Sequence, residues 1–222
     1  MEKVKSEFIN ADSFKFMLDL MGRDNANAVR VSLATGLRIG DVLALKRANL
    51  SPDGEVRTIC DKTGKAFVGA ISTKLAAEIL RRSDGSEWVF PSPSPRRKGL
   101  ARTRQAVWRD VKRAAKLCAS PRNVSPHTAR KIFAVEKFRK SGLSATQEAL
   151  QHDHTETTLL YAFSDLLNES GRPLKKTESP RDLRPVQNGR EILAAFVEAF
   201  GGEAEVCKCL AKFIDILPTG QN

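Results

Sequence analysis

The only tyrosine of this 222-residue chain, Tyr161, lies nine residues after His152 in the stretch HDHTETTLLYAF. A phenol with a pKa near 10 is only about 0.1% ionised at neutral pH, so a reactive tyrosine needs cationic surroundings and a proton acceptor. A tyrosine in an apolar run such as TTLLYAF is more often a core residue. Tyr161 is therefore a candidate nucleophile only if other segments supply the groups that activate its hydroxyl.

Two such segments lie upstream. Arg38 follows a glycine in TGLR at the expected start of a helix, and His127 and Arg130 of SPHTAR share one helix face. An oxygen that attacks a phosphodiester places extra negative charge on its non-bridging oxygens, where guanidinium groups donate forked hydrogen bonds. His127 is the best-placed proton acceptor for Tyr161. This chemistry requires no metal and no ATP, and the chain lacks a GxxxxGK[ST] phosphate loop.

The order of these motifs resembles the catalytic domain of the tyrosine recombinases, the phage integrase family. It runs TGLR with an acid three residues on and LxL, then HxxR, then LxH with a tyrosine nine beyond, over residues 10–168. The resemblance implies a mainly α-helical fold with a small antiparallel β-hairpin, and it makes Tyr161 the nucleophile. The residues that it places around the scissile phosphate are Arg38, His127, Arg130 and His152. The family's hairpin lysine aligns with Lys62 of DKTGK, with Lys65 as second choice.

The resemblance also implies a reaction and its partners. Tyr161 would cleave one strand of double-stranded DNA to form a 3′-phosphotyrosyl bond, Lys62 would protonate the leaving 5′ oxygen, and His152 would donate a hydrogen bond to a phosphate oxygen. Rejoining to a new 5′ hydroxyl gives site-specific recombination by integration, excision, inversion or resolution. The active form would be a tetramer on paired DNA sites that passes through a four-way junction. We expect a weak oligomer or monomer without DNA, accessory DNA-bending proteins, and no cofactor.

Two alternatives stay open at this point. A type IB topoisomerase-like enzyme shares the tyrosine nucleophile but rejoins the same strand and so relaxes DNA. A non-catalytic DNA-binding regulator derived from a recombinase would need no reactive tyrosine. The LxH and HxxR motifs favour an integrase, and none of the six expected catalytic positions is lost.

Three positions depart from the family pattern. Gln151 stands where many members have glycine before the histidine, and Lys131 follows Arg130 where a second histidine is common. His154 lies too far along to match the motif histidine. We interpret His154 as a surface or DNA-proximal side chain.

The charge of the chain predicts a polyanionic partner. Its 37 lysines and arginines exceed its 26 aspartates and glutamates and give a net charge of +11. Residues 169–222 are electrically neutral, so the excess lies within 1–168, and it is densest over 96–116, where Asp110 is the only acid. We predict that basic residues of this stretch contact the DNA backbone: Arg96, Arg97, Lys98, Arg102, Arg104, Arg109, Lys112 and Arg113.

Apolar periodicity and turn residues predict the elements that carry these groups. Left-handed Gly22 and Gly36 are expected to end the first two helices, Gly64 to turn the hairpin, and Pro91 to end a strand. The predicted helices are 13–22, 27–36, 40–50, a helix from Ser72 or Thr73 to Arg82, Arg102 to about Cys118, His127 to Ser141 before Gly142, 144–150, and one from Thr155. The predicted strands are 55–60, 65–72 and 86–92.

The domain organisation follows from the same patterns. Residues 1–168 are expected to form the catalytic domain, 169–188 a polar linker with three prolines, and 189–222 a helical tail. The tail would either dock onto a neighbouring protomer or fold back on its own domain. No N-terminal DNA-clamp domain is recognised, which suits either a minimal recombinase or a fragment of a longer chain.

The apolar runs, the N-terminal stretch and the cysteines favour a cytoplasmic, DNA-associated protein. No run approaches the roughly 18 apolar residues that span a membrane, and MEKVKSEFINADSF lacks the apolar core of a secretory signal. The four cysteines are scattered in a way that suits neither a disulfide framework nor a zinc site, so we expect reduced thiols.

Overall fold

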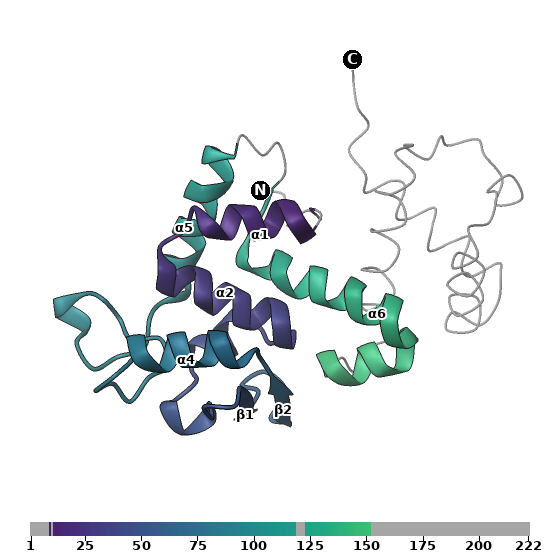
Figure 1. Cartoon of the computed structure of the whole chain (residues 1–222), viewed down its shortest axis with the longest axis horizontal. Helices are drawn as coiled ribbons and strands as arrows, with labels where there is room; N and C mark the ends of the chain where they lie inside the picture. Colours follow the sequence, from purple (N-terminus) through teal and green to yellow (C-terminus); the bar gives the residue numbers. More distant parts are fainter. Residues whose placement is uncertain (1–8, 10, 119–122, 152–222) are drawn as a thin grey trace, which may run out of the picture. The chain divides into compact units, whose positions relative to one another are not determined.

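The computed structural model of the chain describes residue 9, residues 11–118 and residues 123–151. Within these residues, 9–137 together with 149–151 form one compact unit, and 138–148 belong to a second. The helices are α1 (Ala11–Asp19), α2 (Arg23–Thr35), α3 (Ile39–Leu43), α4 (Thr73–Arg82), α5 (Arg104–Leu117) and α6 (Pro126–Leu150) (Figure 1). Two strands, β1 (Glu55–Ile59) and β2 (Ala66–Ala70), and two 3₁₀ turns, Arg47–Asn49 and Pro95–Arg97, complete the described elements. The mainly α fold with a small antiparallel sheet is confirmed.

Helix α2 lies at the centre of the first unit. It packs against α1, α3, α4 and α5, and Figure 1 shows it between α1 and α4. Its Val29 is fully buried, as are Phe14 of α1 and Val107 and Val111 of α5. Small buried residues of α2 such as Ala28 let these neighbours approach closely. The core therefore holds α2 among its neighbours, and the C-terminal end of α2 leads into the predicted site.

Gly36 ends α2 as predicted. Its φ of 75° is left-handed, and its N–H donates to the carbonyl oxygen of Ser32. A Cβ at this position would lie 2.5 Å from two ring carbons of Phe133. Both the backbone conformation and the close approach of α6 thus require glycine here.

The predicted role of Gly22 is wrong. Helix α1 ends at Asp19, and Gly22 has a φ of −58° and precedes α2 as its N-terminal cap residue. Its N–H donates to the carboxylate of Asp110 on α5, over 2.8 Å. The sequence pattern predicted that Gly22 would cap the end of the first helix. Instead, its N–H is bound by a side chain of another helix.

The third predicted helix is shorter than expected. Instead of running over 40–50, α3 ends at Leu43. The N–H of Lys46 donates to the side chain of Asn49, and the N–H of Arg47 donates to the carbonyl of Glu87. Because these two amides donate to groups outside a helix, the helix does not continue and the chain turns toward the hairpin.

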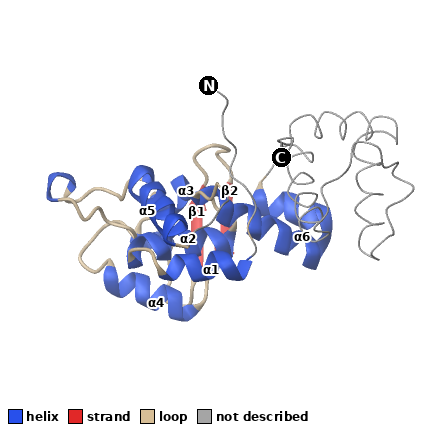
Figure 2. Ribbon diagram, turned by 90° about the horizontal axis from the view of Figure 1, so that it is seen from above, coloured by secondary structure: helices blue, strands red, loops and turns tan. Residues whose placement is uncertain are grey.

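The β-hairpin is confirmed. Strands β1 and β2 are antiparallel with Ile59 opposite Ala66, and Gly64 has the left-handed φ of 64° that the tight turn needs. Figure 2 shows the pair in red. Val56 and Phe67 are buried on one face of the pair, as expected from the alternation of side chains along a strand. The hairpin is thereby held on the helical core with its turn at the edge of the site.

The predicted cap of α4 is confirmed, and the predicted strand over 86–92 is wrong. Ser72 caps α4 by accepting a hydrogen bond from the N–H of Leu75. Residues 86–92 form only isolated bridges, one between Pro91 and Ala101, because proline has no N–H to donate to a ladder. The Ser92 N–H instead donates to Leu100, which closes the base of a loop that carries much of the basic cluster.

Helix α5 begins two residues later than predicted, with Thr103 as its cap. Helix α6 is continuous through Gly142 and Ser144, so the predicted break between two helices is wrong. A glycine in a helix interior costs about 1 kcal/mol relative to alanine, which the surrounding turns can offset. The helix predicted from Thr155, the linker 169–188 and the tail 189–222 lie outside the described residues, as do His152, His154 and Tyr161.

Residues 9, 11–118 and 123–151 contain neither a candidate membrane span nor a candidate cluster of metal ligands. None of their helices is both long and apolar enough to cross a membrane. No group of three or more potential metal ligands is found among them.

Candidate active site

A cleft of about 1130 Å³ brings together four of the six predicted catalytic residues. Arg38 enters it from the start of α3, Lys62 from the hairpin loop, and His127 and Arg130 from the first turns of α6. Lys65, the alternative hairpin lysine, is not among the residues that line this cleft. Segments far apart in the sequence thus place four basic side chains around the same cleft.

The turn after α2 positions Arg38. The hydroxyl of Ser32 donates to the carbonyl of Leu37 over 2.7 Å, and the N–H of Leu37 donates to the hydroxyl of Thr35 over 3.2 Å. Arg38 follows with an extended backbone, φ −64° and ψ 144°, as the cap residue of α3. The half-buried side chain lines the cleft, as the sequence predicted from its place after a glycine cap.

Arg130 is held by the C-terminal ends of two helices. Its side chain is only 3% exposed. One terminal nitrogen donates to the carbonyl of Gly36 after α2, and the other donates over 2.6 Å to the carbonyl of Leu150 at the end of α6. Carbonyls at helix C-termini lack intrahelical partners and carry partial negative charge, so a buried guanidinium suits them well. These two bonds fix the plane of the guanidinium at the wall of the cleft.

Asp41 is a further residue of the site. It is the acidic residue three positions after Arg38 in the TGLR motif. One carboxylate oxygen accepts the N–H of Asp61 over 3.0 Å, directly before Lys62 in the hairpin loop. The other oxygen is buried and has no hydrogen-bond partner among the described residues. Asp41 therefore attaches the lysine-bearing loop to the helix that carries Arg38.

The environment of Asp41 also acts on a neighbouring thiol. Cys60 is buried on the cleft wall, and burial together with the Asp41 carboxylate raises its pKa, against the opposing effect of Arg38 and Arg130. A thiol with a raised pKa is a poor nucleophile at neutral pH. Cys60 thus fits the reduced structural role that its sequence context predicts.

His127 is a neutral imidazole in this cleft. Its side chain keeps an exposed surface, yet the surrounding protein and the cations Lys131, Arg130 and Arg38 lower its pKa to about 4. Desolvation by the cleft walls is the largest cause, and each nearby positive charge adds to the cost of a second cation. At neutral pH the ring can therefore accept a proton.

We expect His127 to titrate far below an ordinary histidine in the DNA-free protein. Among the three histidine signals in an NMR titration, one should have a midpoint near 4 and should vanish in His127→Asn. Because the unfolded imidazole takes up its proton near pH 6.5, the free energy of unfolding should fall as the pH drops from 6.5 toward 4. This fall should be shallower in His127→Asn, and a His127 midpoint near 6.5 would contradict the prediction.

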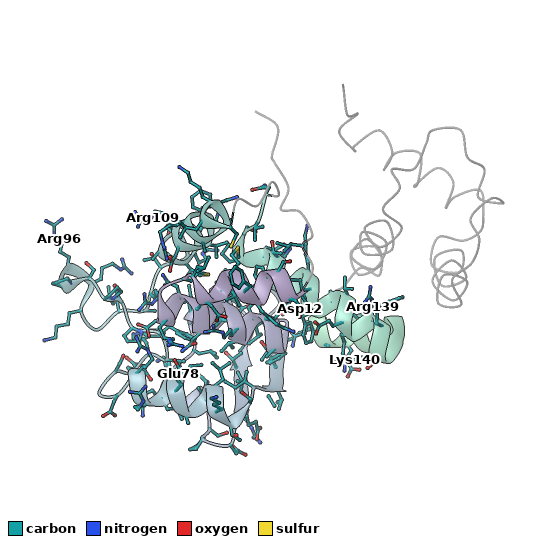
Figure 3. All side chains as sticks on the ribbon, turned by 45° about the horizontal axis from the view of Figure 1, so that its top comes forward. Asp12, Glu78, Arg96, Arg109, Arg139 and Lys140 are labelled. Atoms are coloured by element: carbon teal, nitrogen blue, oxygen red, sulfur yellow. The ribbon has the colours of Figure 1, made fainter. Side chains whose placement is uncertain are left out.

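The eight basic residues predicted to contact DNA separate into two groups in the structure. Five have exposed side chains with no ion pair to another described residue: Arg96, Arg97, Lys98, Arg104 and Arg109. Figure 3 shows Arg96 at the outer end of a loop that extends away from the helices, with Arg109 on the outside of α5. Arg97 and Arg104 also line the cleft, so this group extends the positive surface outward from the site.

The other three are engaged within the protein. Arg102 is 8% exposed and pairs with Asp24 over 2.9 Å. Arg113 pairs with Asp110 over 2.6 Å, and Lys112 donates to the side chain of Asn123. The buried ion pair of Arg102 anchors the start of α5 on α2, which is a structural role that the sequence pattern could not distinguish from DNA contact.

Comparison with known proteins places this arrangement in context. Residues 7–166 match the model of the phage integrase family. Tyrosine recombinase XerC of Xanthomonas campestris pv. campestris is 30% identical over 147 residues, which cover 64% of this chain and 45% of XerC. The chain spans about half the length of the curated relatives that it matches.

Solved structures share the fold. A lambda integrase (75-356) dimer bound to a COC' core site superposes with a TM-score of 0.61 at 21% identity, over 80% of this chain and 65% of that one. The lambda integrase catalytic core superposes with a TM-score of 0.55 at 21% identity, over 67% of this chain and 92% of the core. With the family match over residues 7–166, this shows that the chain belongs to the phage integrase family, whose catalytic-core fold it contains.

Proposed function

We propose that the chain is the catalytic part of a site-specific tyrosine recombinase that cleaves and rejoins DNA through a 3′-phosphotyrosyl intermediate. The observation that carries the proposal is the single cleft in which Arg38, Lys62, His127 and Arg130 converge. Membership in the phage integrase family and similarity to relatives named tyrosine recombinases support it. His152 and Tyr161 complete the proposed site from the sequence motif.

The two arginines would stabilise the transition state. As Tyr161 attacks, negative charge grows on the non-bridging phosphate oxygens, and Arg38 and Arg130 would donate hydrogen bonds to them, aided by His152. Arg130 is already oriented by its backbone partners, so little reorganisation is needed when charge develops. One such donor is typically worth about a hundred- to a thousandfold in rate.

Proton transfers would fall to His127 and Lys62. Neutral His127 would accept the phenolic proton of Tyr161, and the nearby phosphate would raise its pKa as the substrate binds. Lys62 would give a proton to the leaving 5′ oxygen. The phosphotyrosyl bond keeps the energy of the broken linkage, so a new 5′ hydroxyl can attack it without ATP.

Double-stranded DNA is the proposed substrate, and the proposed active form is a tetramer assisted by DNA-bending proteins. Lambda integrase, a fold neighbour, has been solved as a dimer bound to a core site and as a tetramer bound to a Holliday junction. The exposed basic residues that extend from the cleft support a similar DNA contact here. Their position predicts that the projecting loop follows the phosphate backbone next to the scissile phosphate.

The loop makes a measurable prediction. Replacing Arg96, Arg97 and Lys98 by glutamine should weaken DNA binding and should lower the slope of log affinity against log salt by about 0.9 for each phosphate that the loop no longer neutralises. Fluorescence anisotropy at several salt concentrations measures this slope. A matched control removes Lys74 and Arg81 from α4, which contributes no residue to the cleft of the described part. Equal slopes for the loop variant and the wild type would contradict the prediction.

The proposal itself is tested by trapping the covalent intermediate. Selection from a random duplex pool would first identify the cognate DNA, and a nicked version of that site should then accumulate a covalent protein–DNA adduct. If no adduct forms on any selected site, the proposal of an enzyme is overturned and the non-catalytic DNA-binding regulator is favoured. A two-site plasmid separates the enzymes, because a recombinase yields recombinants and a topoisomerase-like enzyme yields only relaxed circles.

A further inference from the structure

Gln151 has an unusual backbone and two specific side-chain partners. It is the only non-glycine residue with positive φ in the described part of the chain, at 51°, directly after α6. Left-handed backbone is strained for residues with a side chain. The Gln151 side chain accepts a hydrogen bond from the hydroxyl of Thr63 over 3.0 Å and donates one to the carbonyl of Ala66 over 2.8 Å. A glutamine persists here in a conformation that glycine would adopt freely, and its side chain bridges two points of the hairpin.

Those two points lie on either side of the hairpin turn that follows Lys62. Thr63 is its immediate neighbour, and Ala66 begins β2. On the other side of Lys62, the N–H of Asp61 donates to Asp41. The loop backbone that carries Lys62 is thus held on one side by the helix of Arg38 and on the other by Gln151. The side chain of Lys62 is itself exposed and extends from this anchored backbone.

The same short segment also holds Arg130. The carbonyl of Leu150, one residue before Gln151, accepts the hydrogen bond from Arg130. Residues 150 and 151 therefore connect a buried guanidinium of the cleft to the loop of the cleft lysine. His152 follows next in the sequence.

We propose that Gln151 is a positioning residue that sets the Lys62 loop against Arg130, so that Lys62 can reach the leaving 5′ oxygen. The inference rests on the proposed function and assigns a task to the variable middle position of the LxH motif. In the step concerned, the Tyr161 oxygen bonds to phosphorus, the bond from phosphorus to the 5′ oxygen breaks, and the proton of Lys62 passes to that oxygen. Without the bridge, the lysine would sample more positions and deliver the proton less often.

Two substitutions isolate the side chain from the backbone. Gln151→Gly relieves the left-handed strain and removes both hydrogen bonds. Gln151→Asn keeps an amide that tolerates this backbone but is one methylene too short to hold both partners. Thr63→Val removes one of the two bonds from the loop side, and Thr63→Ser is its matched control because it keeps the hydroxyl.

The decisive comparison uses two forms of the nicked cognate DNA in single-turnover cleavage by the full chain. One has the natural 5′ oxygen, and the other has sulfur in its place, which leaves as a thiolate of pKa about 8.5 and needs no proton. On oxygen, Gln151→Gly and Gln151→Asn should slow cleavage about tenfold, a part of what a general acid typically contributes. On sulfur, both should cleave within about twofold of the wild type, as should Lys62→Ala. Adding Gln151→Gly to Lys62→Ala should cause no further loss on oxygen, because the two changes act on one step.

A second measurement does not depend on activity. Hydrogen exchange at the Asp61 and Gly64 amides should be at least about fivefold faster in Gln151→Gly than in the wild type, since the loop loses an anchor. Three results would each overturn the inference. They are cleavage of the oxygen DNA by both variants at the wild-type rate, equal losses of rate on the oxygen and sulfur DNA, and unchanged hydrogen exchange. If the wild-type chain cleaves neither DNA, the proposed function fails and the catalytic role of Gln151 fails with it. An active wild type with unaffected variants overturns the inference alone.

Discussion

Tyr161→Phe is expected to abolish the covalent protein–DNA adduct on a nicked cognate site. The chain has no other tyrosine, so no neighbouring phenol can replace the lost nucleophile. Phenylalanine keeps the aromatic ring but has no oxygen to attack phosphorus. On a nicked site the short fragment that carries the new 5′ hydroxyl diffuses away after cleavage, so the wild-type adduct accumulates and is resolved on a denaturing gel. The variant should show no band above background.

DNA binding provides the control for Tyr161→Phe. Affinity for the intact site should stay within about twofold of the wild type, because binding depends mostly on the basic surface. Peptide mapping of the wild-type adduct should place the modification on the peptide that contains Tyr161. An adduct of normal yield in the phenylalanine variant would show that another residue is the nucleophile.

Arg130→Lys should lower single-turnover cleavage about a hundred- to a thousandfold, the loss typical of one transition-state donor. The guanidinium donates to Gly36 and Leu150 from two different nitrogens, and these two bonds fix its plane at the wall of the cleft. A lysine has a single nitrogen and no such plane, so it cannot hold both carbonyls and face the phosphate in the same geometry. Rapid quenching with saturating protein measures the cleavage step itself.

Stability must be measured alongside, since Arg130 is buried. A carbonyl left without its partner costs about 1–3 kcal/mol, which should appear as a lower midpoint in urea unfolding. Arg81→Lys, an exposed exchange on α4, is the matched control and should change neither quantity. If the rate of Arg130→Lys falls only in proportion to its unfolded fraction, Arg130 has a structural role and no part in the chemistry.

Local signals predicted part of the fold well. The hairpin with Gly64, the Ser72 cap and the left-handed Gly36 each depend on residues within one turn of each other. Such features form wherever the chain has the right residue at the right offset, because their hydrogen bonds are made between near neighbours.

Two of the predictions that failed depended on a distant partner. Gly22 donates to Asp110, and Arg47 donates to Glu87, so their backbone amides are satisfied by segments that periodicity alone cannot place nearby. Gly142 was expected to end a helix, yet α6 runs through it. For Gly22 and Arg47 the helix boundary is set by tertiary contacts, which outweigh a local preference of about 1 kcal/mol.

The candidate catalytic residues and the family could be predicted from the sequence alone, because the order and spacing of motifs are recognised without knowledge of contacts. Arg38, His127 and Arg130 could be chosen in this way. The cations that share the cleft are known only from the folded chain: Lys62 lines it and Lys65 does not, and Arg102 lines it while it is also buried in an ion pair with Asp24.

The roles of Asp41 and Gln151, and the low pKa of His127, also depend on the tertiary structure. Each arises from groups that approach through space from distant parts of the chain. Hydrogen bonds act over about 3 Å, and charges in a partly desolvated cleft act over a few ångströms more. Distance in the sequence does not predict either separation, so these features required the folded chain.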